Sequence, residues 1–551
     1  MAEHEALREG GLRWLVEHQN ADGGWGDTTK SKSNISTTAL CWAALGTGTS
    51  ADGRAHAADR GVRWLADAGG TVGSAEAVRQ SLPQLIAKRY GKDRTFSVPI
   101  LMHLAICGRL DWSEVPALPF ELAALPHQLF GALRLPVVSY ALPALIAIGQ
   151  AIHHHHPSWN PLPRLIRSVA RKPTLAVLDM IQPENGGFLE ATPLTSFVTM
   201  ALASAGQAES RVVKRTVEFL RSSVRVDGSW PIDTNLATWL STLAVKALAN
   251  QPRALSPEQR LTLREWLLNQ QYQVEHLYTH AAPGGWAWTP LPGGVPDADD
   301  TPGALLALLH LGVVDGPMEQ AAAAGVRWLM SLQNRDGGIP TFCRGWGALP
   351  FDRSSPDLTA HALRAWSAWY GHLSGVVPGI KPVMERAIRK GITFLAKSQR
   401  SDGSWIPLWF GNEHAVNDEN PVYGTAQVLV ALRELDERGY DGLRDMKSRA
   451  VEQLVAAQNE DGGWAGSKGA ASTTEETALA VEALAGTEHV DAVERGCAWL
   501  CVAVECGTWR EPSPIGFYFA KLWYYERLYP LIWTVGALGR VAALEAIHPQ
   551  R

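Results

Sequence analysis

A short phrase of the form Gln-x-x-Asp-Gly-(Gly/Ser)-Trp recurs along this chain of 551 residues. It reads QNADGGW at Gln19–Trp25, QRSDGSW at Gln399–Trp405 and QNEDGGW at Gln458–Trp464. Self-similarity of this kind indicates one supersecondary unit that is used many times. Weaker copies are QPENGGF (Gln182–Phe188), QNRDGGI (Gln333–Ile339), VDGSW ending at Trp230 and PGGW ending at Trp286.

The residues on either side of each phrase show helical periodicity. Runs such as GLRWLVEHQ and AVEQLVAAQ have apolar residues at i, i+3 and i+4 and end at the Gln. The Asp-Gly step predicts a turn, since Gly allows positive φ and Asp bonds the local backbone. Runs such as TTALCWAALG and EETALAVEALAG then continue as helices. Repeated helix pairs stack in a line or close into an α/α barrel, and with little strand signal anywhere the predicted class is all-α.

Tryptophan is the commonest aromatic residue, with 22 Trp against 12 Phe and 11 Tyr. The Gln of each phrase can hydrogen-bond a helix end while the indole stacks over the next helix. We therefore interpret most of these Trp residues as scaffold and expect the chemistry elsewhere.

Charge and cysteine content exclude several classes of protein. Lys and Arg number 50 against 55 Asp and Glu, so no basic surplus exists to neutralise phosphates, and we expect no nucleic-acid partner. Six Cys without a CxxC pair predict buried thiols rather than disulfides or a metal site. The opening MAEHEALREGG lacks the apolar core of a signal peptide, which predicts a cytoplasmic protein. A linker over 225–235 divides the chain near residue 230.

The strongest chemical signal is PDADDT, which places Asp297, Asp299 and Asp300 within four positions. Three carboxylates so close cannot all ionise cheaply, so the pKa of at least one must rise, and such an acid is a proton donor. A calcium loop is excluded by the missing Gly and closing Glu, and a helix N-cap accounts for one Asp only. The upstream GGWAW adds indole faces that would hold a cation.

A second signal is SPDLTAH, which puts Asp357 and His361 four residues apart on one face of a predicted helix. At this spacing the two side chains can hydrogen-bond each other. An imidazolium beside the aspartates would make a neighbouring carboxyl more acidic. An isolated Asp–His pair is more often structural, but beside the three aspartates the functional interpretation is favoured.

These motifs together resemble the squalene–hopene cyclase family of class II terpene cyclases. GGWAW followed by PDADDT is similar to that family's GGW…PDxDDTA block, and DLTAH to its D-V-T-A-H. The segments NPVYGTA, VPALPFELAAL and YYERLYPLIWTVGALGR resemble its Y-G-T, VPxxPPE and C-terminal motifs. The resemblance covers nearly the whole chain.

The resemblance implies two helical domains, each an α/α barrel with Gln-Trp repeats, and a large apolar cavity between them. It predicts an N-terminal domain over 1–230 and a C-terminal catalytic domain over 231–551. Family members lie on a membrane, and the segment 125–170 combines an apolar stretch with the basic RLIRSVARK. This predicts peripheral, monotopic contact with the cytoplasmic side of a membrane. The resemblance also suggests a homodimer.

The resemblance also implies roles for the polar residues. Asp299 would be the Brønsted acid that protonates a terminal alkene, while Asp297 and Asp300 hold and tune it. His361, held by Asp357, would correspond to the family's His that strengthens the acid. Protonation starts the reaction, so neither a metal nor a cofactor is expected.

Aromatic residues at matching positions would contact the substrate and stabilise cations. Trp288 stands where the family has a cation-stabilising Phe, and Tyr423 lies in the Y-G-T segment. The other matching positions are Trp239, Phe342, Tyr140 and Phe517.

The implied reaction is cyclisation of a linear isoprenoid through carbocations, with squalene or a related triterpene precursor as the leading substrate. One alternative is a farnesyl or geranylgeranyl diphosphate or a meroterpenoid precursor. In that case Lys521 or Arg344 would bind the diphosphate and Mg²⁺ could assist. A second alternative is a non-catalytic helical-repeat protein that binds isoprenoids, which the intact acid residues disfavour.

Overall fold

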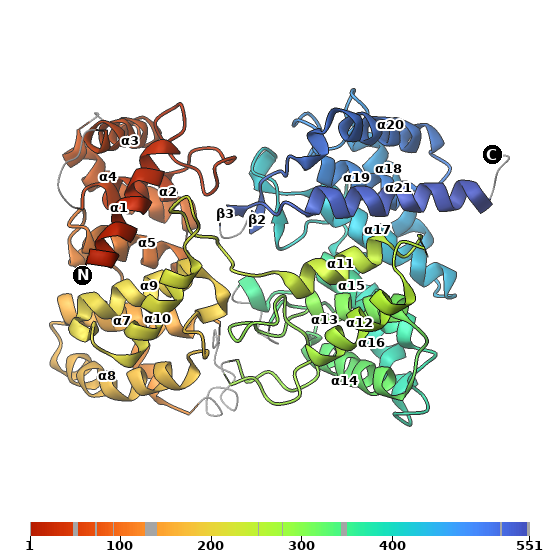
Figure 1. Ribbon diagram of the computed structural model, residues 1–551, viewed down its shortest axis with the longest axis horizontal. Coiled ribbons are helices and arrows are strands. Elements are labelled where there is room, and N and C mark those ends of the chain that lie inside the picture. Colours follow the sequence, from red (N-terminus) through yellow and green to blue (C-terminus); the bar gives the residue numbers. More distant parts are fainter. Residues whose placement is uncertain are drawn as a thin grey trace. The chain divides into compact units, whose positions relative to one another are not determined.

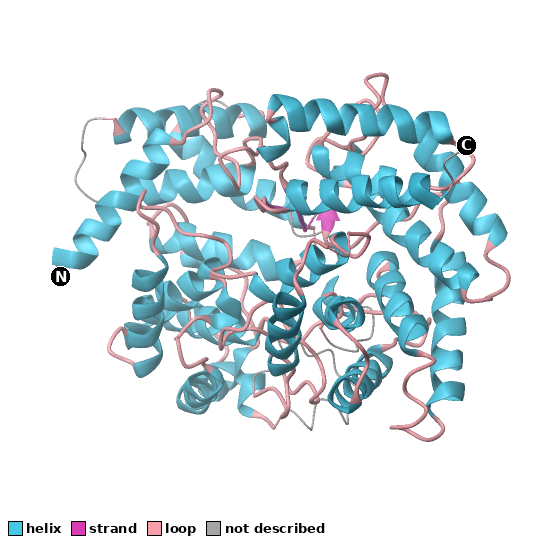
Figure 2. Cartoon of the chain, turned by 45° about the vertical axis from the view of Figure 1, so that its right-hand side comes forward, coloured by secondary structure: helices cyan, strands magenta, loops and turns pink. Residues whose placement is uncertain are grey.

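The computed structural model describes residues 2–47, 53–71, 74–91, 93–126, 140–251, 253–277, 279–342, 350–517 and 521–547. The fold is mostly helical, with very little strand, which confirms the predicted class (Figure 2). The chain forms two compact units. Unit 1 contains Met1–Asn235 and Leu291–Gly293, and unit 2 contains Leu236–Pro290 and Gly294–Arg551. The change of unit after residue 235 falls at the end of the linker expected over 225–235.

Unit 2 is an α/α barrel (yellow-green to blue in Figure 1). Each helix of an inner ring contacts the next one along the ring, and the last contacts the first, so the ring closes. The inner helices are α11 (Ala237–Ala247), α13 (Asp300–Leu311), α15 (Pro356–Trp369), α17 (Pro421–Glu437), α19 (Thr474–Leu484) and α21 (Tyr529–Ile547). The outer helices are α12 (Pro257–Asn269), α14 (Gly316–Leu332), α16 (Ile380–Ser398), α18 (Arg444–Ala457) and α20 (Val490–Cys506).

A small antiparallel sheet joins two loops of unit 2. Its strands β1 (Phe410–Gly411), β2 (Ile515–Phe517) and β3 (Leu522–Tyr524) pair in that order. Phe410 lies opposite Phe517 in the register, so a loop before α17 is tied to a loop before α21.

Unit 1 also consists of paired helices. Helices α2 and α3, α3 and α4, α7 and α8, and α9 and α10 contact each other. The helix pairs of unit 1 do not by themselves establish a second barrel, which stays a prediction. Its helices are α1 (Ala2–Glu17), α2 (Ile35–Leu45), α3 (Arg54–Gly69), α4 (Ala75–Tyr90), α5 (Arg94–Ile106), α7 (Leu142–His155), α8 (Pro161–Ile181), α9 (Thr192–Leu202) and α10 (Arg211–Ser223).

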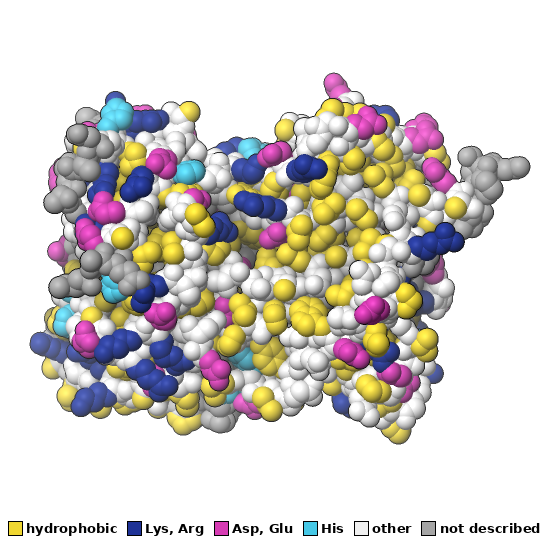
Figure 3. Space-filling view, in the orientation of Figure 1, with side chains coloured by type: hydrophobic (Ala, Val, Ile, Leu, Met, Phe, Trp, Pro, Cys, Tyr) yellow, Lys and Arg dark blue, Asp and Glu magenta, His cyan; other side chains and the backbone are white. Residues whose placement is uncertain are grey.

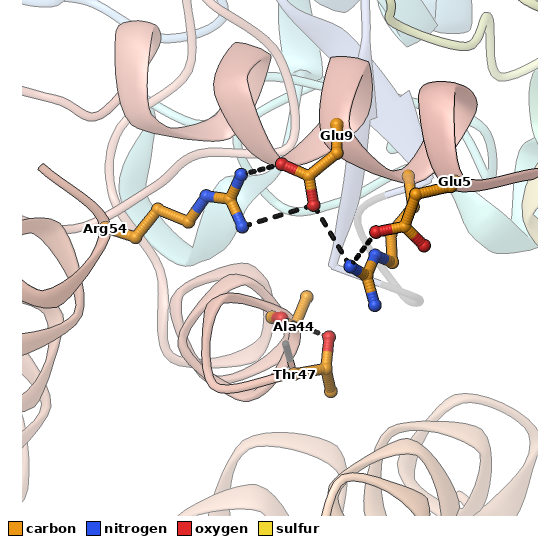
Figure 4. A network of polar contacts seen from close by, with 6 residues as sticks. Glu5, Glu9, Ala44, Thr47 and Arg54 are labelled. Atoms are coloured by element: carbon orange, nitrogen blue, oxygen red, sulfur yellow. Dashed lines mark hydrogen bonds and ion pairs between the residues drawn. The ribbon is translucent and has the colours of Figure 1, made fainter. Parts of the chain in front are cut away.

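An ion-pair network fastens α1 to α3 in unit 1 (Figure 4). The guanidinium of Arg54 donates to both carboxylate oxygens of Glu9, and Arg8 donates to Glu9 and Glu5. The hydrogen bond from Arg54 lowers the pKa of the Glu9 carboxyl. The first helix is thereby attached to α3, the second helix after the first Gln-Trp phrase.

The Gln-Trp phrase forms the same hydrogen bonds in copy after copy. In the copy at Gln399, the side-chain Nε2 donates to the carbonyl of Gly403 at 2.9 Å and to that of Met446, on the next outer helix, at 3.1 Å. The indole Nε1 of Trp405 donates to the carbonyl of Leu395 in the last turn of α16. Gln19, Gln182, Gln271, Gln333 and Gln458 donate in the same paired way.

The backbone of six of these turns is closed by a threonine of the following inner helix. The Trp405 N–H donates to the hydroxyl of Thr425 at 3.1 Å, in the first turns of α17. Equivalent bonds join Trp25 to Thr38, Phe188 to Thr195, Trp286 to Thr301, Ile339 to Thr359 and Trp464 to Thr477. The turn thus connects one outer helix, the next outer helix and the inner helix between them.

We predict that the glycine of this turn is required for close approach as well as for its dihedral angle. Gly403 has φ +87°, and a Cβ there would lie 2.4 Å from the carbonyl oxygen of Arg449. Gly442 has a similar φ of +77° with open space around it. Gly442→Ala should therefore cost about 1–2 kcal/mol for the backbone angle alone, and Gly403→Ala about 3 kcal/mol or more.

Calorimetric unfolding of the two variants measures this difference, because both carry the same change at a similar backbone angle. Equal falls in the unfolding temperature would show that close approach contributes nothing.

Candidate active site

The acidic loop at 296–301 is built on a Gln-Trp turn. The Trp286 N–H donates to Thr301 Oγ1 at 3.0 Å, and the Asp297 N–H donates to the Trp286 carbonyl at 3.0 Å. The Ala298 N–H donates to the carbonyl of Thr341 at 2.9 Å, which ties the loop to the next turn. Since α13 begins at Asp300, the loop is held at both ends by backbone hydrogen bonds.

Asp297 and Asp300 are buried and share a hydrogen bond between their carboxyl groups. Asp297 Oδ1 also accepts the backbone N–H groups of Asp299 and Asp300, both at 2.8 Å, at the start of α13. Burial raises the pKa of Asp297 to about 6. Burial and the neighbouring charge of Asp297 raise the pKa of Asp300 well above its usual range. The pair therefore holds a proton near neutral pH and fixes the backbone of the loop.

Asp299 differs from its two neighbours because its side chain is 22% exposed and lines a pocket. Burial and the charges of Asp357 and Asp297 raise its pKa well above the usual range, whereas Lys246 lowers it. Asp299 is therefore a protonated carboxylic acid with access to a cavity. Its Oδ1 lies 3.3 Å from Nδ1 of His361.

The surroundings of His361 favour the neutral imidazole over the imidazolium that the sequence suggested. Burial and the positive charges of Lys246 and Arg364 lower its pKa well below 6.5. Its Nε2 finds no hydrogen-bond partner among the described residues. A buried N–H without a partner costs more than a bare lone pair, so the proton belongs on Nδ1 and is donated to Asp299.

Asp357 does not hold His361, contrary to the prediction from their spacing. Its carboxylate accepts a hydrogen bond from the hydroxyl of Ser355, the residue before α15, and that hydroxyl accepts from the N–H of Leu408 at 3.1 Å. Asp357 is the second residue of α15 and bonds to Ser355, directly before the helix. His361 lies one turn later and contacts Asp299. Asp357 acts on the site through its charge, which raises the pKa of Asp299.

The pocket beside Asp299 lies among the inner helices of the barrel. Every residue that lines it belongs to unit 2, and five of the six inner helices contribute, with Asp299 standing just before the sixth. Its lining residues are Trp239, Leu243, Lys246, Ala247, Asp299, Asp357, His361, Arg364, Tyr423, Ala426, Gln427, Val430, Leu479, Glu482, Ile532, Trp533 and Gly536.

One aromatic cluster borders this pocket. The Trp239 Nε1–H donates to the hydroxyl of Tyr529 at 2.8 Å, and Tyr529 stacks on Trp533 with ring centroids 4.7 Å apart. Tyr423 lies 6.2 Å from Trp533 and stacks on Phe410 at 4.3 Å. Trp239 and Tyr423 were predicted, whereas the other three were missed. Tyr529 and Trp533 stand four residues apart in LYPLIW, which was a usable signal of one helix face.

A second aromatic cluster adjoins the acidic loop through Thr341. Trp288 lies 6.3 Å from Phe342, and Phe342 lies 5.9 Å from Trp409 and 5.5 Å from Phe351. The Trp409 Nε1–H donates to the Thr341 hydroxyl at 3.0 Å. The predicted residues Trp288 and Phe342 are thus neighbours. Trp409 and Phe351, which the sequence did not single out, complete the cluster.

Four predicted residues remain, namely Tyr140, Phe517, Arg344 and Lys521. Tyr140 is buried in unit 1. The backbone of Phe517 pairs in β2, while its side chain and the whole of Arg344 lie outside the described residues. Lys521 forms an ion pair with Asp418 at 2.5 Å. Within the described ranges, no group of His, Cys, Asp and Glu is arranged to hold a metal ion.

Comparison with known proteins gives relatives in sequence and in fold. The family model for the squalene-hopene cyclase C-terminal domain matches residues 1–96 and 236–543. A copalyl diphosphate synthase from Streptomyces cyslabdanicus is 27% identical over 98% of this chain and 88% of its own length. The solved ent-copalyl diphosphate synthase from Streptomyces platensis has a TM-score of 0.58 at 22% identity, covering 96% of this chain and 91% of that one, which shows a common fold.

Other relatives match over part of their length. Enfumafungin synthase from Hormonema carpetanum is 26% identical over 93% of this chain and 42% of its own, and a probable squalene–hopene cyclase from Sinorhizobium fredii is 30% identical over 45% and 40%. The chain thus spans about two fifths of the length of these two relatives. Because the family model matches well over half of the residues, the chain belongs to the squalene-hopene cyclase family.

Proposed function

We propose that the protein is a class II terpene cyclase, which protonates a terminal alkene of a linear isoprenoid and cyclises the resulting cation. The observation that carries this proposal is Asp299, a carboxylic acid kept protonated by burial and opened to a pocket bordered by aromatic rings. An alkene is a weak base, so it needs an undissociated acid in a site without competing water.

The proposed first step transfers the Asp299 proton to the less substituted alkene carbon, and the π electrons form the new C–H bond. A tertiary carbocation and the Asp299 carboxylate remain. The Nδ1–H of His361 then donates to that carboxylate, and it is already in place at 3.3 Å. Aromatic faces of Trp239 and Tyr423 attract the cation as it moves along the chain of double bonds.

We predict that Asp299→Asn abolishes cyclisation. The amide keeps the size of the side chain but has no acidic proton, so product formation should fall to about one thousandth or less. The measurement is product analysis by mass spectrometry after incubation with a linear isoprenoid that the unchanged protein converts.

The matched control is Asp441→Asn, since Asp441 is exposed and lies in a loop. It should cyclise at the rate of the unchanged protein. Product formation by Asp299→Asn at a comparable rate would mean that another group supplies the proton.

Between the two substrate classes, a prenyl diphosphate is favoured. The copalyl diphosphate synthase from Streptomyces cyslabdanicus matches almost end to end, whereas the probable squalene–hopene cyclase matches less than half of either chain. We predict conversion of geranylgeranyl diphosphate to a product that retains its diphosphate, with squalene unchanged, in parallel incubations analysed by mass spectrometry. Conversion of squalene alone would instead assign the triterpene reaction expected from the sequence.

Peripheral membrane contact is proposed for α8 of unit 1. The apolar stretch is buried over 146–152, but α8 exposes Leu162, Leu165, Ile166 and Val169 to between 49 and 68%. This i, i+3, i+4, i+7 stripe faces solvent, and Trp159 beside it is 93% exposed. Lys and Arg side chains gather over α8 and α10, at the lower left of Figure 3. An apolar stripe flanked by basic residues suits an anionic lipid surface.

We predict that the double variant Leu165→Glu, Val169→Glu weakens binding to phosphatidylglycerol vesicles at least tenfold, roughly the loss expected for two apolar side chains. Vesicle flotation measures it. Val226→Glu is the matched control, since Val226 is fully exposed on a turn of the same unit. Unchanged flotation with altered sedimentation would assign the stripe to a contact between copies of the chain.

No helix within the described ranges combines the length and hydrophobicity needed to cross a membrane.

A further inference from the structure

Charged side chains line the part of the pocket that lies further along the inner helices than Asp299, although the proposed reaction needs none of them. Trp239 and Tyr423 are each the third residue of an inner helix, whereas Lys246, Arg364 and Glu482 come about two turns further along theirs. Because one turn of helix rises about 5.4 Å, these charges form a deeper layer of the same pocket. Charges inside a barrel are costly unless they are paired and hydrogen-bonded.

The charge of Arg364 in this layer is neutralised by a carboxylate from outside it, Glu434 on α17. The Nε and Nη2 of Arg364 donate to one oxygen of Glu434 at 3.0 and 2.6 Å, which makes a tight and largely buried ion pair. Lys246, in contrast, forms no ion pair with any described residue. Lys246 is therefore a cation that shares a pocket with Asp299 and is not tied to a carboxylate.

We propose that Lys246 is the fixed positive charge that makes Asp299 a strong enough acid, acting through space on the carboxylate that forms when the proton leaves. This inference rests on the proposed function. Lys246 does not touch the alkene in this account, so it is a positioning residue rather than a catalytic one. It supplies the charge that the sequence led us to expect from a protonated His361.

The electrostatics of the neighbouring groups agree with this assignment. Lys246 lowers the pKa of Asp299 and contributes to keeping the pKa of His361 low, so it acts on both members of the acid pair. Burial lowers the pKa of Lys246 itself to about 8, with a further lowering by Arg364. The carboxylates of Glu482, on α19, and Glu434, on α17, oppose that shift and favour the charged amine.

The remaining titratable groups around Lys246 come from the helices that pack beside it. His310 on α13 has its pKa lowered by burial first and then by Lys246, so it is neutral and adds no charge. Asp357 on α15 raises the pKa of Asp299 and therefore opposes Lys246. On α21 the pocket is lined by Ile532, Trp533 and Gly536, none of which titrates.

The test is the rate of a single turnover as a function of pH in the full-length protein. Lys246→Met removes the charge and keeps the length of the side chain, so the rate should fall at least tenfold, with KM little changed. Lys246→Arg keeps the charge and should restore most of the rate. In the unchanged protein the rate should fall as pH rises through about 8, where Lys246 loses its proton, and Lys246→Arg should lack that step.

Glu482→Gln provides a second variant that leaves Lys246 in place. Without this carboxylate the pKa of Lys246 should drop, so the decline in rate should begin at lower pH. Lys390→Met is the control for removing a lysine, since Lys390 is exposed on the outer helix α16. A merely structural role for Lys246 would change the unfolding temperature but not move the pH profile.

Two outcomes would overturn the inference. An unchanged single-turnover rate in Lys246→Met would show that its charge does not act on Asp299. A slow steady state with a normal first turnover in Lys246→Arg would show that Lys246 transfers protons instead, because Arg does not give up its proton near neutral pH.

An infrared titration separates this inference from the proposed function. The protonated Asp299 carboxyl gives a carbonyl band that Asp299→Asn identifies, and no substrate is required. In Lys246→Met that band should persist to higher pH than in the unchanged protein. A shifted band in a protein that converts no isoprenoid would refute the cyclase proposal alone, and an unshifted band in an active cyclase would refute only the role of Lys246.

Discussion

The hydrogen bond between a turn N–H and a threonine hydroxyl in the next inner helix positions most of the polar residues of the candidate active site. Thr301 follows Asp300 directly, Thr359 lies between Asp357 and His361, and Thr425 stands two residues after Tyr423. Each site residue therefore occupies the same place, the first turns of an inner helix, in successive copies of one repeat. The ring of inner helices then brings these first turns together at one pocket.

This arrangement also has an electrostatic consequence. The N-terminal end of a helix carries a partial positive charge, and the first turns of α15 and α17 lie at the pocket beside Asp299. Such ends stabilise a carboxylate, so the scaffold itself favours the product of proton transfer. The role of the repeat is thus wider than packing, although its Gln and Trp side chains touch only the scaffold.

The sequence predicted the parts of the site that are local. The trio at 297–300 and His361 are recognisable because their chemistry depends on residues close together in the chain. The prediction that Asp357 holds His361 failed because spacing along a helix shows which side chains can meet, but not that Ser355 offers Asp357 a nearer partner. Tyr529 was missed because its partner Trp239 is 290 positions away.

The same limit applies to the fold. The all-α class and the helices beside each phrase follow from periodicity, which is a local property. Closure of the barrel depends on the contact between α11 and α21, which are far apart in the chain. The sequence pattern of either helix does not predict this contact. Gln271 was overlooked because it bonds to Gly284 across 13 residues, whereas the other Gln side chains reach a Gly four residues away.

A raised pKa and a strong acid at Asp299 are compatible once the two reactions are distinguished. The pKa measures loss of the proton to bulk water, which would leave a lone carboxylate in a poorly solvated pocket, so burial raises it. Transfer to an alkene in the same pocket leaves a carboxylate and a carbocation together, and their attraction is strong where the dielectric constant is low. Burial thus keeps Asp299 protonated, because it disfavours loss of the proton to water. It disfavours transfer of the proton to the alkene much less. The donated Nδ1–H of His361 then stabilises the carboxylate that proton transfer leaves behind.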